Sequence, residues 1–191
     1  MIVSRNEIEA ACQRAALGVG LAHGFAEDAT AIAARLAADG EDVAAIMLAA
    51  LSSIEENGCP IPCFNHDERL WRSAEQAIVP ALVAGPCAAD LLRADPGAVV
   101  QIGRTDEPKV IAAALALAGL DAAEVPLERG QSMRLTARPG RPLATPRPPV
   151  EGFTIADAVW RELLKLAART YVPASEQSRL RGAGAGLNDA D

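Results

Sequence analysis

Three runs of apolar side chains with a helical period occupy the first third of the chain. The first run follows Ser4 and Glu7, which have the spacing of a capping box, and it predicts a helix over residues 5–17. A second run starts after Gly24, and a third covers residues 43–57. Because each run has a single apolar stripe, the three helices are expected to pack as a bundle.

Shorter apolar runs, separated by glycine and proline, follow between residues 59 and 137. Proline removes a backbone donor and biases the residue before it towards extended geometry, so this part is expected to form a small sheet with short helices. The expected elements are a helical turn holding Trp71, strands over 77–84 and 98–102, helices over 85–94 and 108–117, and a hairpin over 124–137 that turns at Arg129-Gly130.

The last part of the chain begins with a connector and ends with a glycine-rich tail. Five prolines between residues 138 and 149 predict an extended segment without elements of its own. Thr154 and Asp157 then predict the start of a helix that ends between residues 167 and 170, with Phe153 as its hydrophobic staple.

These elements predict an α+β fold, with an N-terminal helical bundle packed on a small mixed sheet and a C-terminal helix followed by the tail. Half of the residues are hydrophobic but only 3% are aromatic, so the core is expected to consist of small side chains, which suits close helix packing. One domain of 191 residues is expected, with a helical part over 1–58, a mixed α/β part over 59–137, the connector over 138–149, and the C-terminal helix and tail over 150–191.

Charge and composition exclude several function classes. The formal net charge is −7 and no block of basic residues is present, which argues against nucleic acid as a partner. No apolar run approaches a membrane span and none follows a basic head, so the predicted location is the cytoplasm, with the four cysteines reduced. No Walker loop or dinucleotide fingerprint occurs, and no cofactor is predicted.

Hydroxyl, arginine and glycine residues are concentrated in the last 20 residues, where they have the composition of an anion site. Hydroxyl and guanidinium groups donate hydrogen bonds, and alternating glycines allow successive backbone N–H groups to point the same way. The predicted ligand-binding residues are Ser175, Glu176, Ser178, Arg179, Arg181, Gly182, Gly184 and Gly186. The alternative is a solvated tail whose arginines pair with surface acids.

A second group of reactive side chains comprises Cys59, Cys63 and His66. Two thiolates and an imidazole are zinc ligands, and Cys12 or Cys87 would complete the site. The same residues also have the chemistry of a Cys–His nucleophile pair. Because the spacing is not that of a C-x-x-C knuckle and two prolines stiffen the loop, ordinary thiols are the expected state, and no metal is predicted.

Two stretches carry a resemblance to a known family. The first is Ser4-x-x-Glu7-Ile8-Glu9 with Gly20-Leu21 and Gly24-Phe-Ala-Glu-Asp-Ala29, and the second is Tyr171-Val-Pro-Ala-Ser-Glu-x-Ser-Arg-x-x-Gly-Ala-Gly-Ala-Gly186. Together they resemble a bacterial family catalogued only as a domain of unknown function. The resemblance implies a fold but no activity.

The opening helices are also similar to those of the malate/L-lactate dehydrogenase family, through Gly20-Leu-x-x-Gly-Phe-Ala-Glu-Asp-Ala29 and Leu36-Ala-Ala-Asp39. In that family the acidic residue is followed by Arg-Gly and a Ser-His-Gly catalytic segment. Here Asp39-Gly-Glu-Asp has no such histidine. We therefore expect a shared helical opening and no dehydrogenase chemistry.

Two hypotheses of function follow. In the first, the protein is an enzyme or a small enzyme subunit that binds an anionic metabolite, a carboxylate or a phosphate, through the Ser/Arg/Gly tail. In the second, it is a non-catalytic interaction or regulatory subunit whose tail docks into a partner protein. No general base stands out, so whether the chain is catalytic stays open.

Overall fold

The computed structural model describes residues 1–59, 63–65, 70–72, 78–121, 125, 128–138 and 152–171. Its helices are α1 (Arg5–Gly18), α2 (His23–Ala38), α3 (Val43–Asn57), α4 (Ala81–Ala94), α5 (Pro108–Leu117) and α6 (Asp157–Ala168). Its strands are β1 (Ile2–Val3), β2 (Cys63–Asn65), β3 (Leu70–Arg72), β4 (Val99–Ile102), β5 (Met133–Thr136) and β6 (Phe153–Thr154).

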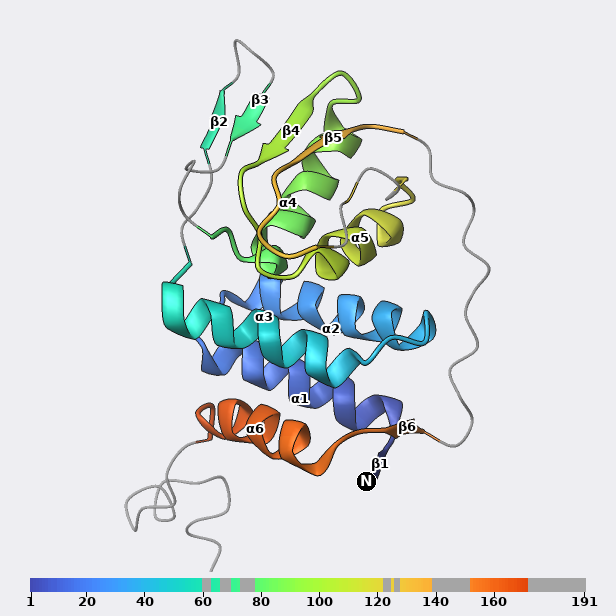
Figure 1. Ribbon diagram of the computed structural model, residues 1–191, viewed down its shortest axis with the longest axis vertical. Helices are drawn as coiled ribbons and strands as arrows, with labels where there is room; N and C mark the ends of the chain where they lie inside the picture. Colours follow the sequence, from blue (N-terminus) through green and yellow to red (C-terminus); the bar gives the residue numbers. More distant parts are fainter. Residues whose placement is uncertain are drawn as a thin grey trace, which may run out of the picture.

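The elements are stacked in layers (Figure 1). Helix α6 packs on α1 and α3, α1 packs on α2, and α2 contacts the α4–α5 pair, which lies next to the four-stranded sheet. The α+β class and the N-terminal helical bundle are therefore confirmed. The helical layers and the sheet meet through α4 and α5.

The first helix forms as the capping box predicts. The Ser4 side chain accepts from the Glu7 backbone N–H at 3.3 Å, and the Glu7 carboxylate accepts from the Ser4 backbone N–H at 2.8 Å. At its other end, Gly18 lies directly against α6, where an added Cβ would stand only 2.1 Å from the Leu166 carbonyl oxygen. Glycine at this position thus permits the close approach of α1 and α6.

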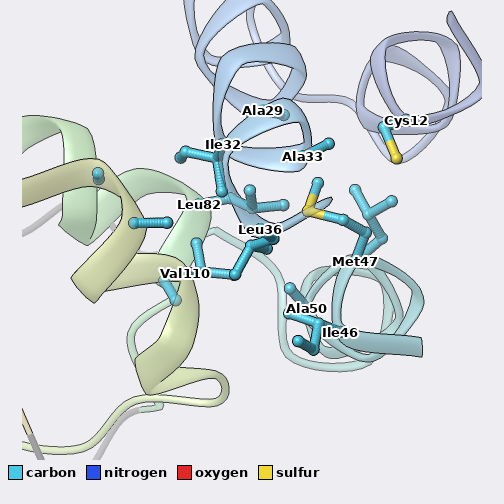
Figure 2. Close-up of a cluster of buried hydrophobic side chains, with 14 of the residues drawn as sticks. Cys12, Ala29, Ile32, Ala33, Leu36, Ile46, Met47, Ala50, Leu82 and Val110 are labelled. Atoms are coloured by element: carbon cyan, nitrogen blue, oxygen red, sulfur yellow. The ribbon is translucent and has the colours of Figure 1, made fainter. Parts of the chain in front are cut away.

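The core is centred on α2, whose inward side chains meet α3 on one side and the α4–α5 pair on the other (Figure 2). Ile32 and Leu36 of α2 lie among Met47 of α3, Leu82 of α4 and Val110 of α5, and each of these side chains is at most 2% exposed. Alanine fills much of the remaining interior, which allows the helices to pack closely.

The sheet is mixed, with strand order β2-β3-β4-β5. Strands β3 and β4 are parallel, whereas β2 and β5 pair antiparallel with their neighbours. A further parallel bridge joins Val79 to Thr105, just before α4 and α5 begin. A separate two-stranded sheet joins β1 to β6, with Val3 opposite Phe153.

The predicted strand over residues 77–84 is wrong, because α4 already begins at Ala81. Pro80 precedes the helix, where its missing N–H costs nothing, and its carbonyl accepts from Val83 N–H at 3.0 Å and Ala84 N–H at 2.9 Å. Residues 81–86 are all buried, so the helix has no polar face at its start and its sequence lacks a helical period.

The predicted hairpin is also wrong in its pairing. Strand β5 has the expected alternation, with Met133 and Leu135 buried and Arg134 exposed. Its partner, however, is β4, with Leu135 opposite Val100. Residues 124, 126 and 127 lie outside the described residues.

Three smaller expectations need correction. Trp71 belongs to strand β3 and not to a helical turn. Helix α2 begins at His23, before the predicted start behind Gly24. Thr154 does not cap α6, since it pairs with Ile2 in the small sheet and α6 starts after Ala156. The helices over 43–57 and 108–117 and the strand ending at residue 102 form as predicted.

Candidate functional site

A polar cleft of about 500 Å³ lies between α3 and the loops that follow β4 and precede β5. We call it the Arg104 cleft. It is lined by Ala49, Ser52, Ser53, Glu56, Asn57, Ile78, Arg104, Thr105, Asp106, Arg129 and Gly130. Its volume is in the range of small-molecule sites in proteins.

The loop side of the cleft is built where two parallel chain segments end. Val79 N–H donates to the Arg104 carbonyl at 2.9 Å, and the Thr105 hydroxyl donates to the Val79 carbonyl at 3.2 Å. The first segment continues into α4 and the second into α5. Gly130, in the turn before β5, is held next to Thr105 because its N–H donates to the Thr105 carbonyl at 2.9 Å. Ligands of α/β proteins commonly bind at the carboxyl ends of parallel strands.

Asp106 connects the starts of both helices. Its Oδ1 accepts from Ala81 N–H at 2.9 Å, at the start of α4, and from Glu107 N–H at 2.7 Å, immediately before α5. The first backbone N–H groups of a helix have no partner within the helix, so one carboxylate oxygen here satisfies donors of two helix ends.

The other oxygen of this carboxylate, Oδ2, is buried and has no partner with hydrogen-bond geometry among the described residues. Burial raises the pKa of Asp106, and the hydrogen bond from Ala81 and the nearby Ser53 hydroxyl offset part of that rise. Protonation at Oδ2 is thus easier than for an exposed aspartate.

Glu107 is almost fully buried, and its carboxylate pairs with the guanidinium of Arg129. Burial raises the pKa of Glu107, whereas the positive charge of Arg129 lowers it. This ion pair holds the Arg129 side chain at the cleft. Arg129 is still 62% exposed, so one side of its guanidinium faces solvent.

Arg104 is exposed at the cleft, and no carboxylate within the described part of the chain forms an ion pair with it. On the opposite wall, α3 contributes two half-buried hydroxyls, Ser52 and Ser53, and the exposed Glu56 and Asn57. The cleft therefore offers guanidinium donors from the loops and hydroxyl donors from the helix.

A smaller cavity of about 190 Å³ lies among α2, α4 and α5, lined in part by Asp28, Asp90 and Arg93. Burial, followed by the charge of Asp90, raises the pKa of Asp28. Burial and then the same two carboxylates raise the pKa of Cys87 nearby. A thiol with a raised pKa is a poor nucleophile at neutral pH.

The tail residues predicted to bind an anion all lie outside the described residues, as does His66. They are Ser175, Glu176, Ser178, Arg179, Arg181, Gly182, Gly184 and Gly186. Cys63 is placed in β2, opposite Arg72. Cys59 is exposed, and partial burial raises the pKa of its thiol. The anion-binding role of the tail stays a prediction.

Cys12 is enclosed by apolar side chains of the helical core, where Figure 2 shows its sulfur pointing between the helices. Burial raises the pKa of this thiol to about 12. Since zinc binds thiolates, Cys12 is not suited to be the fourth ligand. Within the described ranges, no group of three or more His, Cys, Asp or Glu side chains is placed to hold a metal ion.

Sequence reasoning passed over the residues that line the Arg104 cleft, although one signal was present. Gly103-Arg-Thr-Asp-Glu-Pro108 places an aspartate just before a proline that starts a helix, directly after a strand. Aspartate in that position accepts from helix N–H groups. The contribution of Ser52, Ser53 and Arg129 has no local signal, because these residues are brought together only by packing.

Comparison with known proteins gives one match. A family model described as "Protein of unknown function (DUF3726)" matches residues 3–68, about a third of the chain. The match supports the predicted resemblance to a domain of unknown function over α1, α2 and α3. No curated protein and no solved structure matches the chain. The terminal motif and the similarity to the malate/L-lactate dehydrogenase family stay predictions. No helix in the described residues has the length and apolar character to cross a membrane.

Proposed function

We propose that the protein binds a small anionic metabolite, a carboxylate or a phosphate, in the Arg104 cleft. The observation that carries the proposal is the arrangement of Arg104 and Arg129 on the loop wall opposite the hydroxyls of Ser52 and Ser53. Guanidinium groups form charge-assisted hydrogen bonds with both kinds of anion, and serine hydroxyls add neutral donors.

The position of the cleft also supports anion binding. It lies beside the starts of α4 and α5, where the helix dipoles favour negative charge. The tail, with Arg179 and Arg181, is the anion site predicted from the sequence. In this proposal the cleft arginines and the tail arginines contact the same ligand.

The proposal is tested by isothermal titration calorimetry with inorganic phosphate, acetate, succinate and glycerol phosphate. Arg104→Gln is expected to weaken binding of the anion that the wild type binds by about 10- to 100-fold, because one charge-assisted contact is lost. Arg134→Gln is the matched control, since Arg134 is an exposed arginine on β5 that does not line the cleft.

The double variant Arg179→Ala/Arg181→Ala tests the tail separately. A loss of affinity comparable with that of Arg104→Gln supports a shared site. If Arg104→Gln binds the anions as the wild type does, or if none of the four anions binds, the proposal is wrong. In that case the alternative hypothesis, in which the tail docks into a partner protein, takes its place.

A further inference from the structure

The two walls of the Arg104 cleft differ in charge. The loop wall carries Arg104 and Arg129. The α3 wall carries Glu56 and Asn57 in the last turn of that helix. The cleft therefore places a carboxylate across from two guanidinium groups, with the hydroxyls of Ser52 and Ser53 beside it.

The helices reinforce this separation of charge. Helix α3 ends at the cleft, and the carbonyl groups of a last helical turn carry partial negative charge. Helices α4 and α5 begin beside the opposite wall, where their dipoles leave partial positive charge, part of which the Asp106 carboxylate already offsets. A ligand with both a positive and a negative group would match both walls.

Glu56 is available for such a ligand. It is exposed, and among the described residues no cation lies within ion-pair distance of it. Its neighbour Glu55, by contrast, pairs with Arg169 of α6 at 2.5 Å and does not line the cleft. The two adjacent glutamates thus differ in whether a side chain of the protein already neutralises them.

Asp106 also lines the loop wall, but its carboxylate oxygens are not open to a ligand. Its Oδ1 is used by the starts of α4 and α5, and its Oδ2 is buried. The Glu107 carboxylate already forms an ion pair with Arg129. Among the described residues that line the cleft, Glu56 is therefore the carboxylate that is exposed to a ligand.

We infer that the ligand is a zwitterion, an amino carboxylate whose ammonium group binds at Glu56 and whose carboxylate binds at Arg104. This inference rests on the proposed function and narrows its substrate class. Neither wall alone selects such a molecule, because Glu56 would accept any amine and Arg104 any anion.

The test compares amino acids with their des-amino analogues by isothermal titration calorimetry. The probes are glycine, 3-aminopropanoate, 4-aminobutanoate and glutamate, each paired with the acid that lacks the amino group. At least one amino acid is expected to bind ten times more tightly than its des-amino partner. Glu56→Gln is expected to remove that difference by weakening binding of the amino acid, whereas the des-amino acid should not bind more weakly, because the variant removes a negative charge near an anion.

Glu55→Gln is the matched control and is expected to keep the preference for the amino acid. Arg104→Gln is expected to weaken both members of each pair. If des-amino acids bind as tightly as amino acids, or if Glu56→Gln keeps the preference, the inference is overturned while anion binding stands. If no carboxylate or phosphate binds at all, the proposed function is overturned with it.

Discussion

Two regions of the molecule are held together by different interactions. One is the set of helical layers formed by α1, α2, α3 and α6, and the other is the junction where α4 and α5 begin. In the helical layers the contacts are apolar and depend on how closely the backbones approach, as Gly18 and Leu166 illustrate. At the junction, Thr105, Asp106 and Glu107 supply buried or partly buried polar groups that join one loop to two helix ends.

This difference between apolar packing and hydrogen bonding predicts which substitutions each region will tolerate. In a close-packed apolar contact, added volume is costly, because neighbouring backbone atoms cannot move aside. At a hydrogen-bonded junction, volume matters less than the loss of an acceptor or donor, because an unsatisfied buried group costs free energy. A substitution that changes only side-chain volume and one that removes only a hydrogen-bonding group will therefore have different effects in the two regions.

The largest effect is expected for Gly18→Ala in the contact between α1 and α6. An added methyl group would overlap the Leu166 carbonyl oxygen, so α6 must shift, and the free energy of unfolding is expected to fall by about 3 kcal/mol or more. Thermal unfolding should show a decrease in Tm of roughly 10 °C. Gly24→Ala is the control, since an added Cβ there meets no atom within 4 Å and Tm should not decrease.

Asp106→Ala is expected to have the next largest effect. It removes the acceptor of Ala81 N–H and Glu107 N–H, so the free energy of unfolding should fall by about 2 kcal/mol. Asp106→Asn keeps an acceptor oxygen and nearly the same volume, and it should lose less than about 1 kcal/mol. Urea denaturation of both variants makes the comparison. Equal destabilisation by alanine and asparagine would mean that the carboxylate does not act as a shared cap.

A smaller effect is expected for Thr105→Val, which keeps the volume of the side chain but removes the hydroxyl that donates to the Val79 carbonyl. The expected loss is about 1 kcal/mol in urea denaturation. Thr30→Val removes a similar bond to the Ala26 carbonyl inside α2. That carbonyl also lies in the hydrogen-bond ladder of the helix, so Thr30→Val should be nearly neutral. Equal losses at both positions would contradict the distinction between the two regions.

The smallest effect is a dependence on pH. Because the pKa of Asp106 is raised on folding, the folded protein binds a proton more tightly than the unfolded chain does. The contribution is fully present below the unfolded pKa of about 3.9 and is lost as pH rises through the folded pKa. The difference in unfolding free energy between wild type and Asp106→Asn should therefore decrease from pH 4 upwards. Asp28 titrates in both proteins and cancels to first order. The charge of Asp106 contributes to the raised pKa of Glu107, so the loss of that charge in the variant changes the difference in the same direction. A difference that does not change with pH would contradict this assignment.

The same contrast explains what could be predicted from the sequence. Helices α1, α3 and α5 have one apolar stripe and clear end signals, such as the Ser4 capping box and Pro108, so local pattern was sufficient. The start of α4 is buried on all sides, and a run without a polar face does not distinguish a helix from a strand. Similarly, β5 shows alternation, but alternation does not tell which strand is its partner.

Even less of the candidate site than of the fold could be predicted from the sequence. Its two walls come from residues 49–57 and 104–106, with a third contribution from 129–130, and only tertiary packing brings these segments together. Local reasoning favoured the tail instead, because its donors are adjacent along the chain. Adjacent donors are visible in a sequence, whereas a cleft between distant segments is not.

The position of α6 bears on whether the segment matched by the family model is an autonomous folding unit. That segment ends at residue 68, yet the outer side of α1 is covered by α6, from the opposite end of the chain. Without Trp160, Leu163 and Leu166, the apolar surface of α1 would face water. In this chain the matched segment is therefore completed by a helix from the other end of the sequence, and α1 and α6 must associate before the apolar surface of α1 is buried.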